Sequence, residues 1–350
     1  MIISGIQQIG IGNPDTPETW KWYRKAFGVD VPVFNEVAEA GLMYKYMGGK
    51  ARNRHAVLAL NMQGGGGFEI WQYTDRVPEK AGFELKLGDL GINITKIKSK
   101  DVELAFKYFK EHDLNLISDL VKNPVGLKHF FAKDPHGNIF EVEEGLDWFS
   151  KGKHVNGGVL GAIIGVSDIN ESLKLYSDIL GYDEVVYDEK GSFEDLSSIS
   201  GGDGNFRRVL LRHSENRVGA FSDLLGSTQI ELIESLDREP AKIFEGRYWG
   251  DEGFIHLCFD INGMEKLKKS CELAGYPFTV DSNNSFEMEN AAGRFAYIED
   301  NDGTLIEFVE THKVPILKKV GLNMDLTKRN PSKSLPKIMI KALGLARVKD

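Results

Sequence analysis

TWKWYRKAFGVD, residues 19–30, has the spacing of an amphipathic helix that ends at a glycine, and SLKLYSDILGYD, residues 172–183, repeats that pattern. A second matching pair, DPHGNIFE at residues 134–141 and DNDGTLIE at residues 300–307, predicts a turn followed by a strand with one Glu among apolar residues. Each pair has one member in each half of the chain, so we expect two related halves. The segment KGKHVNGG, residues 151–158, is typical of a linker between them.

Each half contains the same unit twice. In the last unit, residues 254–261 alternate like a strand, residues 264–274 have helical spacing, and strands follow around Phe278, Phe295 and Phe308. In the other units we expect helices at residues 17–27, 102–112 and 169–180, with a strand over residues 33–46 in the first. The sequence therefore predicts four tandem βαβββ modules, at residues 1–85, 86–150, 151–250 and 251–311. We group them as an N-terminal domain (1–150) and a C-terminal domain (151–311), followed by a basic tail (312–350).

Composition limits the classes of function. A formal net charge of −9 argues against nucleic acid as the main partner, since phosphate binding needs a basic face. Cys258 and Cys271 are the only cysteines, too few for a disulfide framework or a cysteine zinc site, so any metal must use His, carboxylate or amide ligands. The N-terminus has no basic stretch followed by a long apolar run, and no segment has the length of a membrane span, so we expect a cytoplasmic protein without integral membrane contact.

The C-terminal tail differs from the acidic remainder. From His312 onward it carries ten Lys or Arg residues and two Asp residues, and the run from Ile338 to Val348 has the pattern of a short amphipathic helix. We expect a strap packed on the acidic body or on a second subunit, which would make a homodimer. Contact with a membrane surface or nucleic acid is the alternative.

The sequence resembles the vicinal oxygen chelate superfamily of glyoxalases, bleomycin resistance proteins and extradiol dioxygenases, over residues 1–310. The resemblance rests on GIQQIGI from Gly5, on the two helix-to-glycine repeats and, most specifically, on DPHGNIFE from Asp134. It implies an α+β fold in which paired modules form two curved open mixed sheets. In that family each module pair surrounds one metal ion, with ligands from the first and fourth strands of each module.

Carried over position by position, the resemblance implies two sets of metal ligands. The C-terminal half offers Glu231, His256 and Glu307, a set suited to Fe²⁺, Mn²⁺ or Zn²⁺, with Mg²⁺ an alternative. The N-terminal half offers Gln8, Glu69 and Glu141, an all-oxygen set that favours Mn²⁺ or Mg²⁺, or an empty pocket. Gln is a ligand at this place in some glyoxalase relatives. The remaining first-strand positions fall on Asn93 or Ile94 and on Gly161 or Ala162, and neither glycine nor alanine can bind a metal.

Each candidate also has a structural alternative. A strand Glu between apolar neighbours is often the solvent face of a half-buried strand, and His256 alone could be a core histidine. We consider Glu231, His55 and His213 as catalytic acids or bases, since an imidazole titrates near neutrality. Cys258 is expected to be an inert buried thiol. The run from Gly64 to Gly67 indicates a flexible turn, or a lid beside Glu69.

Three functions follow from the resemblance. The first is a glyoxalase, isomerase or lyase acting on a small oxygenated substrate through a metal-stabilised enolate, with Glu231 or Glu69 as base while His256 and Glu307 hold the ion. The second is an extradiol dioxygenase, which needs two His and one carboxylate; here the second His is replaced by Gly161 or Ala162. The third is a metal-free binding protein with a groove lined by aromatic residues, for which the candidates are Trp71, Tyr73, Phe130 and Phe295.

Overall fold

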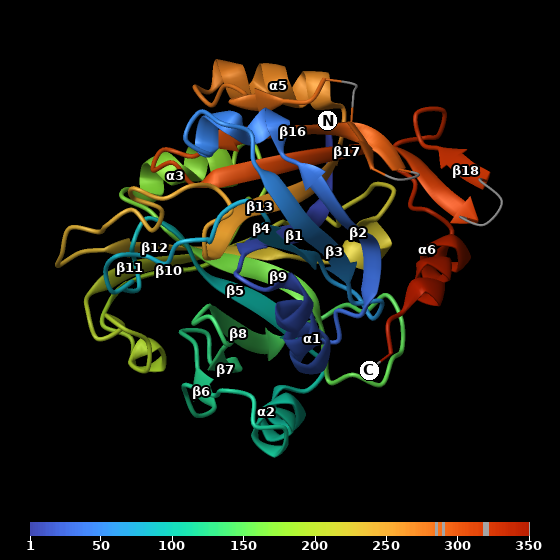
Figure 1. The fold of residues 1–350 in the computed structure, drawn as a ribbon. Helices are drawn as coiled ribbons and strands as arrows, with labels where there is room; N and C mark the ends of the chain where they lie inside the picture. Colours follow the sequence, from blue (N-terminus) through green and yellow to red (C-terminus); the bar gives the residue numbers. More distant parts are fainter. Residues whose placement is uncertain (284–285, 289–290, 318–321, 350) are drawn as a thin grey trace.

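Two curved, open mixed sheets form the centre of the computed structural model, which describes residues 1–283, 286–288, 291–317 and 322–349 (Figure 1). One sheet has ten strands and the other eight. They are built from four βαβββ modules, which confirms the predicted α+β fold class and module count.

Each module begins with a long strand that is followed by a helix. The first contains β1 (Ile2–Gly12), α1 (Thr16–Phe27), β2 (Val31–Glu39), β3 (Asn53–Leu60) and β4 (Gly67–Tyr73). The second contains β5 (Gly91–Ser99), α2 (Val102–Glu111), β6 (Val121–Lys122), β7 (Lys128–Lys133) and β8 (Ile139–Glu144). The third contains β9 (Asn156–Gly165), α3 (Ile169–Tyr176), β10 (Glu184–Gly191), β11 (Phe206–Arg212) and β12 (Gln229–Ser235). The fourth contains β13 (Gly253–Asn262), α5 (Met264–Leu273), β14 (Val280–Asp281), β16 (Ala291–Glu299) and β17 (Leu305–Leu317).

The remaining elements are short. They are the strands β15 (Phe286–Met288) and β18 (Leu322–Asp325), the helices α4 (Ser222–Leu225) and α6 (Lys337–Leu343), and the 3₁₀ helices η1 (Gly41–Tyr46), η2 (Glu194–Leu196) and η4 (Gly344–Ala346). The strand expected over residues 33–46 therefore ends at Glu39 and gives way to η1. The helix expected to reach Leu180 ends at Tyr176.

The sheets pair modules from opposite halves of the chain. The ten-stranded sheet has the order β14-β16-β17-β13-β1-β4-β3-β2, so the first and fourth modules share it. The eight-stranded sheet has the order β10-β11-β12-β9-β5-β8-β7-β6, from the third and second modules. The predicted ligand sets required the two modules of each half to share one sheet, and this pairing is wrong. The repeats identify the modules, but every module presents a similar apolar first strand, so backbone pairing alone can join any two of them.

Sequence repeats correspond to repeated local contacts. Asp15, Asp101 and Asp168 cap the N-termini of α1, α2 and α3 with side-chain hydrogen bonds. The hydroxyl of Tyr23, on α1, donates at 2.7 Å to Oδ2 of Asp134, which lies in the turn before β8. In the other half, the α3 hydroxyl of Tyr176 donates to Asp300 Oδ2 at 2.9 Å, in the turn before β17. The matching segments thus link helix and turn within each half, while the first strands of the modules pair between halves.

The glycine run from Gly64 to Gly67 joins the two sheets. The Gly66 N–H donates to the Val159 carbonyl at 2.9 Å, and the Val159 N–H donates back at 2.8 Å. Gly65 has φ +97°, and a Cβ at that position would lie 2.8 Å from the carbonyl carbon of Gly158. The run is buried, so it is a close backbone crossing and not the flexible turn or lid that we expected.

The C-terminal tail packs on its own chain. In Figure 1, α6 lies along one side of the molecule, beside β2 and β3. Ile340 and Leu335 are buried in a cluster with Val31 and Leu60. The Val348 N–H donates to the Asp30 carbonyl at 2.9 Å. Of the two packing alternatives predicted, the structure contains the strap on the body; the homodimer stays a prediction.

Among the residues that the structure describes, no helix combines the length and the apolar character that crossing a membrane requires.

Candidate metal site

Four neighbouring strands at the centre of the ten-stranded sheet each contribute one polar side chain to a single cluster. The residues are Gln8 on β1, Glu69 on β4, His256 on β13 and Glu307 on β17. In the sheet register, Gly10 pairs with both Glu69 and His256, and Cys258 pairs with both Gln8 and Glu307. Because side chains alternate between the two faces of a sheet, this register brings all four to the same face.

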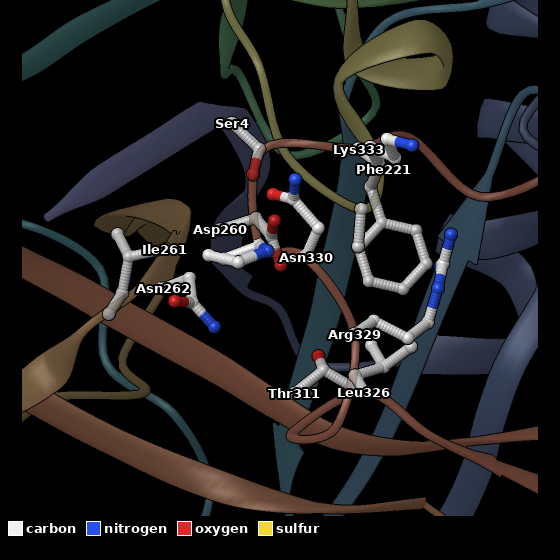
Figure 2. A pocket seen from close by; sticks show the side chains of 12 residues that line it. Ser4, Phe221, Asp260, Ile261, Asn262, Thr311, Leu326, Arg329, Asn330 and Lys333 are labelled. Atoms are coloured by element: carbon white, nitrogen blue, oxygen red, sulfur yellow. The ribbon is translucent and has the colours of Figure 1, made fainter.

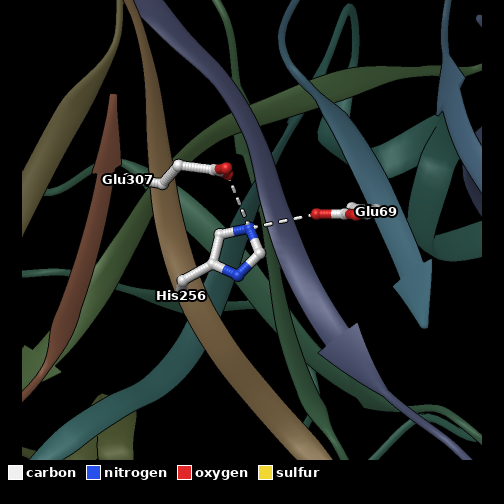
Figure 3. Close-up of side chains that lie close together, drawn as sticks. All are labelled: Glu69, His256 and Glu307. Atoms are coloured by element: carbon white, nitrogen blue, oxygen red, sulfur yellow. Dashed lines mark ion pairs between the residues drawn. The ribbon is translucent and has the colours of Figure 1, made fainter. Parts of the chain in front are cut away.

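Figure 3 shows the carboxylates of Glu69 and Glu307 on either side of the His256 imidazole. His256 Nε2 is 3.1 Å from Glu307 Oε2 and 3.4 Å from Glu69 Oε2. Gln8 Nε2 donates to both of these carboxylate oxygens at 3.3 Å. Ligand atoms of Glu69, His256 and Glu307 all lie within 4.8 Å of one another, and all three residues are buried. This is the spacing of side chains that can share one ion.

Gly10 makes room for the imidazole. A methyl group at this position would overlap the ring of His256, which lies across from Gly10 on the neighbouring strand. The glycine in GIQQIGI therefore serves the site directly, as the place where a side chain from another strand crosses the backbone.

Burial and charge act against each other at His256. Burial alone would lower the pKa of His256, but the carboxylates of Glu307 and Glu69 outweigh it and raise the pKa to about 9. Burial and the same two carboxylates raise the pKa of the neighbouring Tyr297 phenol well above its usual value. The cluster thus holds two buried carboxylates beside one group able to carry positive charge.

The donor set fits a divalent ion. Gln8 Oε1 and His256 Nδ1 are buried, and within the described part of the chain neither has a hydrogen-bond partner. The amide of Gln8 can also turn its oxygen toward the carboxylates, because the two orientations differ only in the assignment of O and N. Rotated in this way, Gln8 would present an amide oxygen next to one imidazole nitrogen and two carboxylates. These are ligands that Mn²⁺, Fe²⁺ and Zn²⁺ accept.

Aromatic side chains cover the cluster. The Trp249 ring is nearly parallel to the His256 ring, with centroids 6.0 Å apart, and Tyr297 meets the same imidazole edge-on at 5.6 Å. The Trp71 ring packs against the Trp249 ring, with the two centroids 4.7 Å apart. The Tyr73 hydroxyl donates to the Trp249 carbonyl, which anchors the segment before β13 over the site. Trp249 and Tyr297 were not among the aromatic residues predicted from the sequence, because no motif there marks either of them.

Glu141 and Glu231 lie in the other sheet. Glu141 on β8 and Glu231 on β12 both contact Lys96 of β5, whose Nζ is 2.7 Å from Glu141 Oε2 and 2.9 Å from Glu231 Oε2. This placement corrects both predicted ligand sets: Glu231 does not join His256 and Glu307, and Glu141 does not join Gln8 and Glu69. The error follows from the module pairing, since residues were grouped by halves while the sheets join opposite halves.

The second cluster contains cations that we did not predict. Arg208 Nε is 2.7 Å from Glu231 Oε1, and His129 Nδ1 is 2.8 Å from Glu141 Oε1. Lys96 lies between Thr95 and Ile97, and Arg208 lies between Arg207 and Val209, so neither has the apolar neighbours on both sides that mark the glutamates. Their place in this cluster could not be predicted from that pattern.

The two histidines proposed as acids or bases lie away from the four-residue cluster. His55 Nε2 contacts Asn35 Oδ1 at 2.7 Å. His55 lies on the same face of β3 as Val57 and Ala59, which belong to the core cluster that contains Tyr23 of α1. Glu69 pairs with Leu58, which lies on the other face of β3. His213 belongs to the third module, where its Nδ1 contacts the Glu215 carbonyl and its Nε2 accepts from the Thr228 N–H. The structure thus gives neither histidine a position beside His256.

A surface pocket lies elsewhere, between the tail and the ends of β1 and β13 (Figure 2). Ser4, Asp260 and Arg329 line it, and its cavity volume is about 20 Å³, close to that of one water molecule. Burial raises the pKa of Asp260 to about 7. None of the four clustered residues lines this pocket.

Comparisons with known proteins agree with this architecture. Residues 5–142 match a family model described as the Glyoxalase/Bleomycin resistance protein/Dioxygenase superfamily, and residues 162–297 match a second model with the same description. Glyoxalase I from Zea mays is 14% identical with a TM-score of 0.53, and the alignment covers 87% of this chain and 92% of that one. A putative dioxygenase from Bacillus subtilis is 16% identical with a TM-score of 0.56, covering 88% and 86%. No curated protein matches the sequence.

Proposed function

Because the chain belongs to the Glyoxalase/Bleomycin resistance protein/Dioxygenase superfamily, we propose that it is a divalent-metal-dependent enzyme of the glyoxalase, isomerase or lyase type. Its substrate would be a small oxygenated molecule. The observation that carries the proposal is the convergence of Gln8, Glu69, His256 and Glu307, one from each of four neighbouring strands, on one buried point.

These four residues would hold the ion. When bound, a divalent ion supplies Lewis-acid charge that stabilises negative charge on substrate oxygens. The neutral imidazole of His256 and the carboxylates of Glu69 and Glu307 suit Mn²⁺, Fe²⁺ or Zn²⁺, with Mg²⁺ as the alternative.

Glu69 is the one ligand of the set that we also assign as the base. Its Oε2 is 3.4 Å from His256 Nε2, whereas the Glu307 oxygen is at 3.1 Å, so Glu69 is the more loosely held carboxylate. In a carbon acid, the C–H bond next to a carbonyl would break, the proton would pass to Glu69 Oε2, and the electron pair would remain on the substrate. Of the two bases considered from sequence, Glu231 is in the other sheet and its Oε1 is 2.7 Å from Arg208 Nε.

The aromatic cover supports chemistry of this kind. Trp249, Trp71 and Tyr297 surround the cluster with apolar surface and are nearly inaccessible to solvent. Excluding water strengthens every charge interaction at the site and protects a reactive intermediate from side reactions. We therefore assign these side chains to water exclusion around the substrate.

The alternatives find less support in the donor set. Dioxygenase chemistry of the extradiol type needs two imidazoles, and the cluster has His256 alone. A metal-free binding protein would need the four aromatic candidates in one groove. Trp71 and Tyr73 do pack together near the cluster, but Phe130 lies under α2 against Phe106 and Phe109.

The test is metal analysis of the full chain. We expect wild type to bind about one Mn²⁺ per chain and His256→Ala to bind none, because the only imidazole of the set is lost. His55→Ala is the matched control: it removes an imidazole from the same sheet but from its other face, and should keep the metal. A His256→Ala variant that binds as much Mn²⁺ as wild type would contradict the proposal. Substrate screening of the metal-loaded protein should begin with carbon acids and diols.

A further inference from the structure

We propose that the ammonium group of Lys96 is a built-in cation of the eight-stranded sheet, at the place where the ten-stranded sheet would hold its metal ion. The chain would then bind one divalent ion and not two. This inference rests in part on the proposed function, since it compares the second cluster with the candidate metal site.

The two clusters have the same backbone plan. In every module the glutamate of the fourth strand pairs in parallel register with a residue of the first strand. In the ten-stranded sheet, Glu69 pairs with Gly10 and Glu307 pairs with Cys258. In the eight-stranded sheet, Glu141 pairs with Lys96 and Glu231 pairs with Ile163. The ligand position of each first strand lies two residues before the residue that pairs with the glutamate. These positions hold Gln8 and His256 in the ten-stranded sheet, but Ile94 and Gly161 in the eight-stranded sheet. The second cluster therefore keeps both carboxylates and has no first-strand ligand.

A large and a small residue have exchanged places across the central strand pair. In the ten-stranded sheet, Gly10 lies opposite His256 and leaves room for its ring. In the eight-stranded sheet, Lys96 lies opposite Gly161. A side chain on Gly161 would overlap the carbonyl oxygen of Gln229, so this position cannot provide a ligand. The space between the carboxylates is filled from the other strand, by the side chain of Lys96.

The ammonium group lies between the carboxylates as a bridging ion would. Lys96 Nζ is 2.7 Å from Glu141 Oε2 and 2.9 Å from Glu231 Oε2, and a third carboxylate, that of Glu143, is at 4.0 Å. Lys96, Glu141, Glu143 and Glu231 are all buried. A buried ammonium is costly unless it is paired, and here it is paired on two sides.

The other carboxylate oxygens are also occupied. Glu231 Oε1 lies 2.7 Å from Arg208 Nε, and Glu141 Oε1 lies 2.8 Å from His129 Nδ1. Each of the four oxygens of these two glutamates is therefore within 2.9 Å of a nitrogen that can carry positive charge. A divalent ion entering this cluster would find its ligands already paired and would add excess positive charge.

The first measurement counts Mn²⁺ bound to the full chain by electron paramagnetic resonance. We expect about one equivalent in wild type and none in His256→Ala. Two equivalents in wild type, or one that remains in His256→Ala, would overturn the inference because the eight-stranded sheet would then hold metal. Two equivalents with one lost in His256→Ala would leave the proposed function intact, so the two failures are distinguishable.

The second measurement replaces the lysine. Lys96→Met keeps an apolar chain of similar length and removes the charge, and should bind about one more Mn²⁺ than wild type, with Glu141, Glu231 and His129 as ligands. Lys98→Met is the matched control, because Lys98 is buried on the same strand but pairs with Asp147 outside the cluster. A folded Lys96→Met variant that binds no more Mn²⁺ than Lys98→Met would overturn the inference. If Lys96→Met does not fold, the count in wild type and His256→Ala decides.

Discussion

The two sheets put glutamates at equivalent places and then diverge. In the ten-stranded sheet, His256 is the one basic side chain that pairs with Glu69 and Glu307 among the residues described, and the amide of Gln8 donates to both. In the eight-stranded sheet, Glu141 and Glu231 are paired with Lys96, and with His129 and Arg208 respectively. One cluster has a deficit of positive charge that a divalent ion could meet, and the other is already neutralised by side chains.

This difference shows what determines a metal site on a repeated scaffold. The carboxylates alone do not distinguish the two clusters, because both clusters have them. The distinction lies in the first-strand residues: an imidazole and an amide in one sheet, and an ammonium group in the other. A ligand set must therefore be judged together with the cations around it.

The largest expected effect is that of Lys96→Met on stability. Without the ammonium group, Glu141 and Glu231 would face each other as buried carboxylates, and breaking a buried ion pair in this way costs about 3–5 kcal/mol. Urea denaturation in the presence of a chelator should show this loss, and added Mn²⁺ should restore part of it. If Lys96→Met lowered the free energy of unfolding no more than Lys98→Met does, Lys96 would not be neutralising the buried carboxylates.

The second prediction concerns the pH dependence of the eight-stranded sheet. Burial would lower the pKa of His129, but Glu141 and Asp195 outweigh both burial and the repulsion from Lys96, and raise it to about 9. The folded state then binds a proton more tightly than the unfolded state, whose His pKa is near 6.5. This stabilisation is complete below pH 6.5 and is lost as the pH rises toward 9, and is on the order of 3 kcal/mol. Between pH 6 and 9, the free energy of unfolding measured by denaturation should decline more steeply with pH in wild type than in His129→Gln. Equal pH dependence in the two proteins would contradict the assignment.

The third prediction concerns metal removal from the ten-stranded sheet. An ion that binds only the folded chain stabilises it by about 2.7 kcal/mol at roughly 100 times its Kd. The unfolding temperature of wild type should therefore fall when a chelator is added. The same chelator should leave His256→Ala unchanged, and a fall of equal size in that variant would place the ion elsewhere.

The smallest expected effect is that of His55→Gln. The side chain loses or weakens one partly exposed hydrogen bond to Asn35, which is worth about 1 kcal/mol. Because His55 faces away from Glu69, its substitution should not change the affinity for Mn²⁺ measured by calorimetry. A large loss of affinity would mean that the two faces of β3 are not independent.

Much of the fold could be predicted from the sequence. The helix-to-glycine repeats and the two turn motifs predicted two related halves, because each repeat is also a repeated local contact, such as Tyr23 with Asp134 and Tyr176 with Asp300. Strand and helix periodicity then predicted two modules in each half. The family resemblance, carried over position by position, implied Gln8, Glu69, His256 and Glu307 as strand residues of the site, and the structure brings all four together on one face of one sheet.

The pairing of modules could not be predicted in the same way. Which first strands meet depends on the packing of whole modules, and Ile9, Ile97, Val159 and Leu257 give those strands similar apolar surfaces. The ligands were therefore assigned to the wrong partners, although their strand positions were correct. The ion pairs of Lys96 and Arg208 could not be predicted for a different reason, since they become visible only once Glu141 and Glu231 are seen to share one sheet.

The most direct test of the account compares four substitutions in the full chain, with bound Mn²⁺ counted in each. We expect Glu69→Gln and Glu307→Gln, in opposite halves of the sequence, both to weaken Mn²⁺ binding by about 10-fold or more, and Glu141→Gln and Glu231→Gln to leave it unchanged. Loss of binding in Glu231→Gln together with retention in Glu69→Gln would contradict this expectation, because the ion would then follow the halves of the sequence and not the sheets.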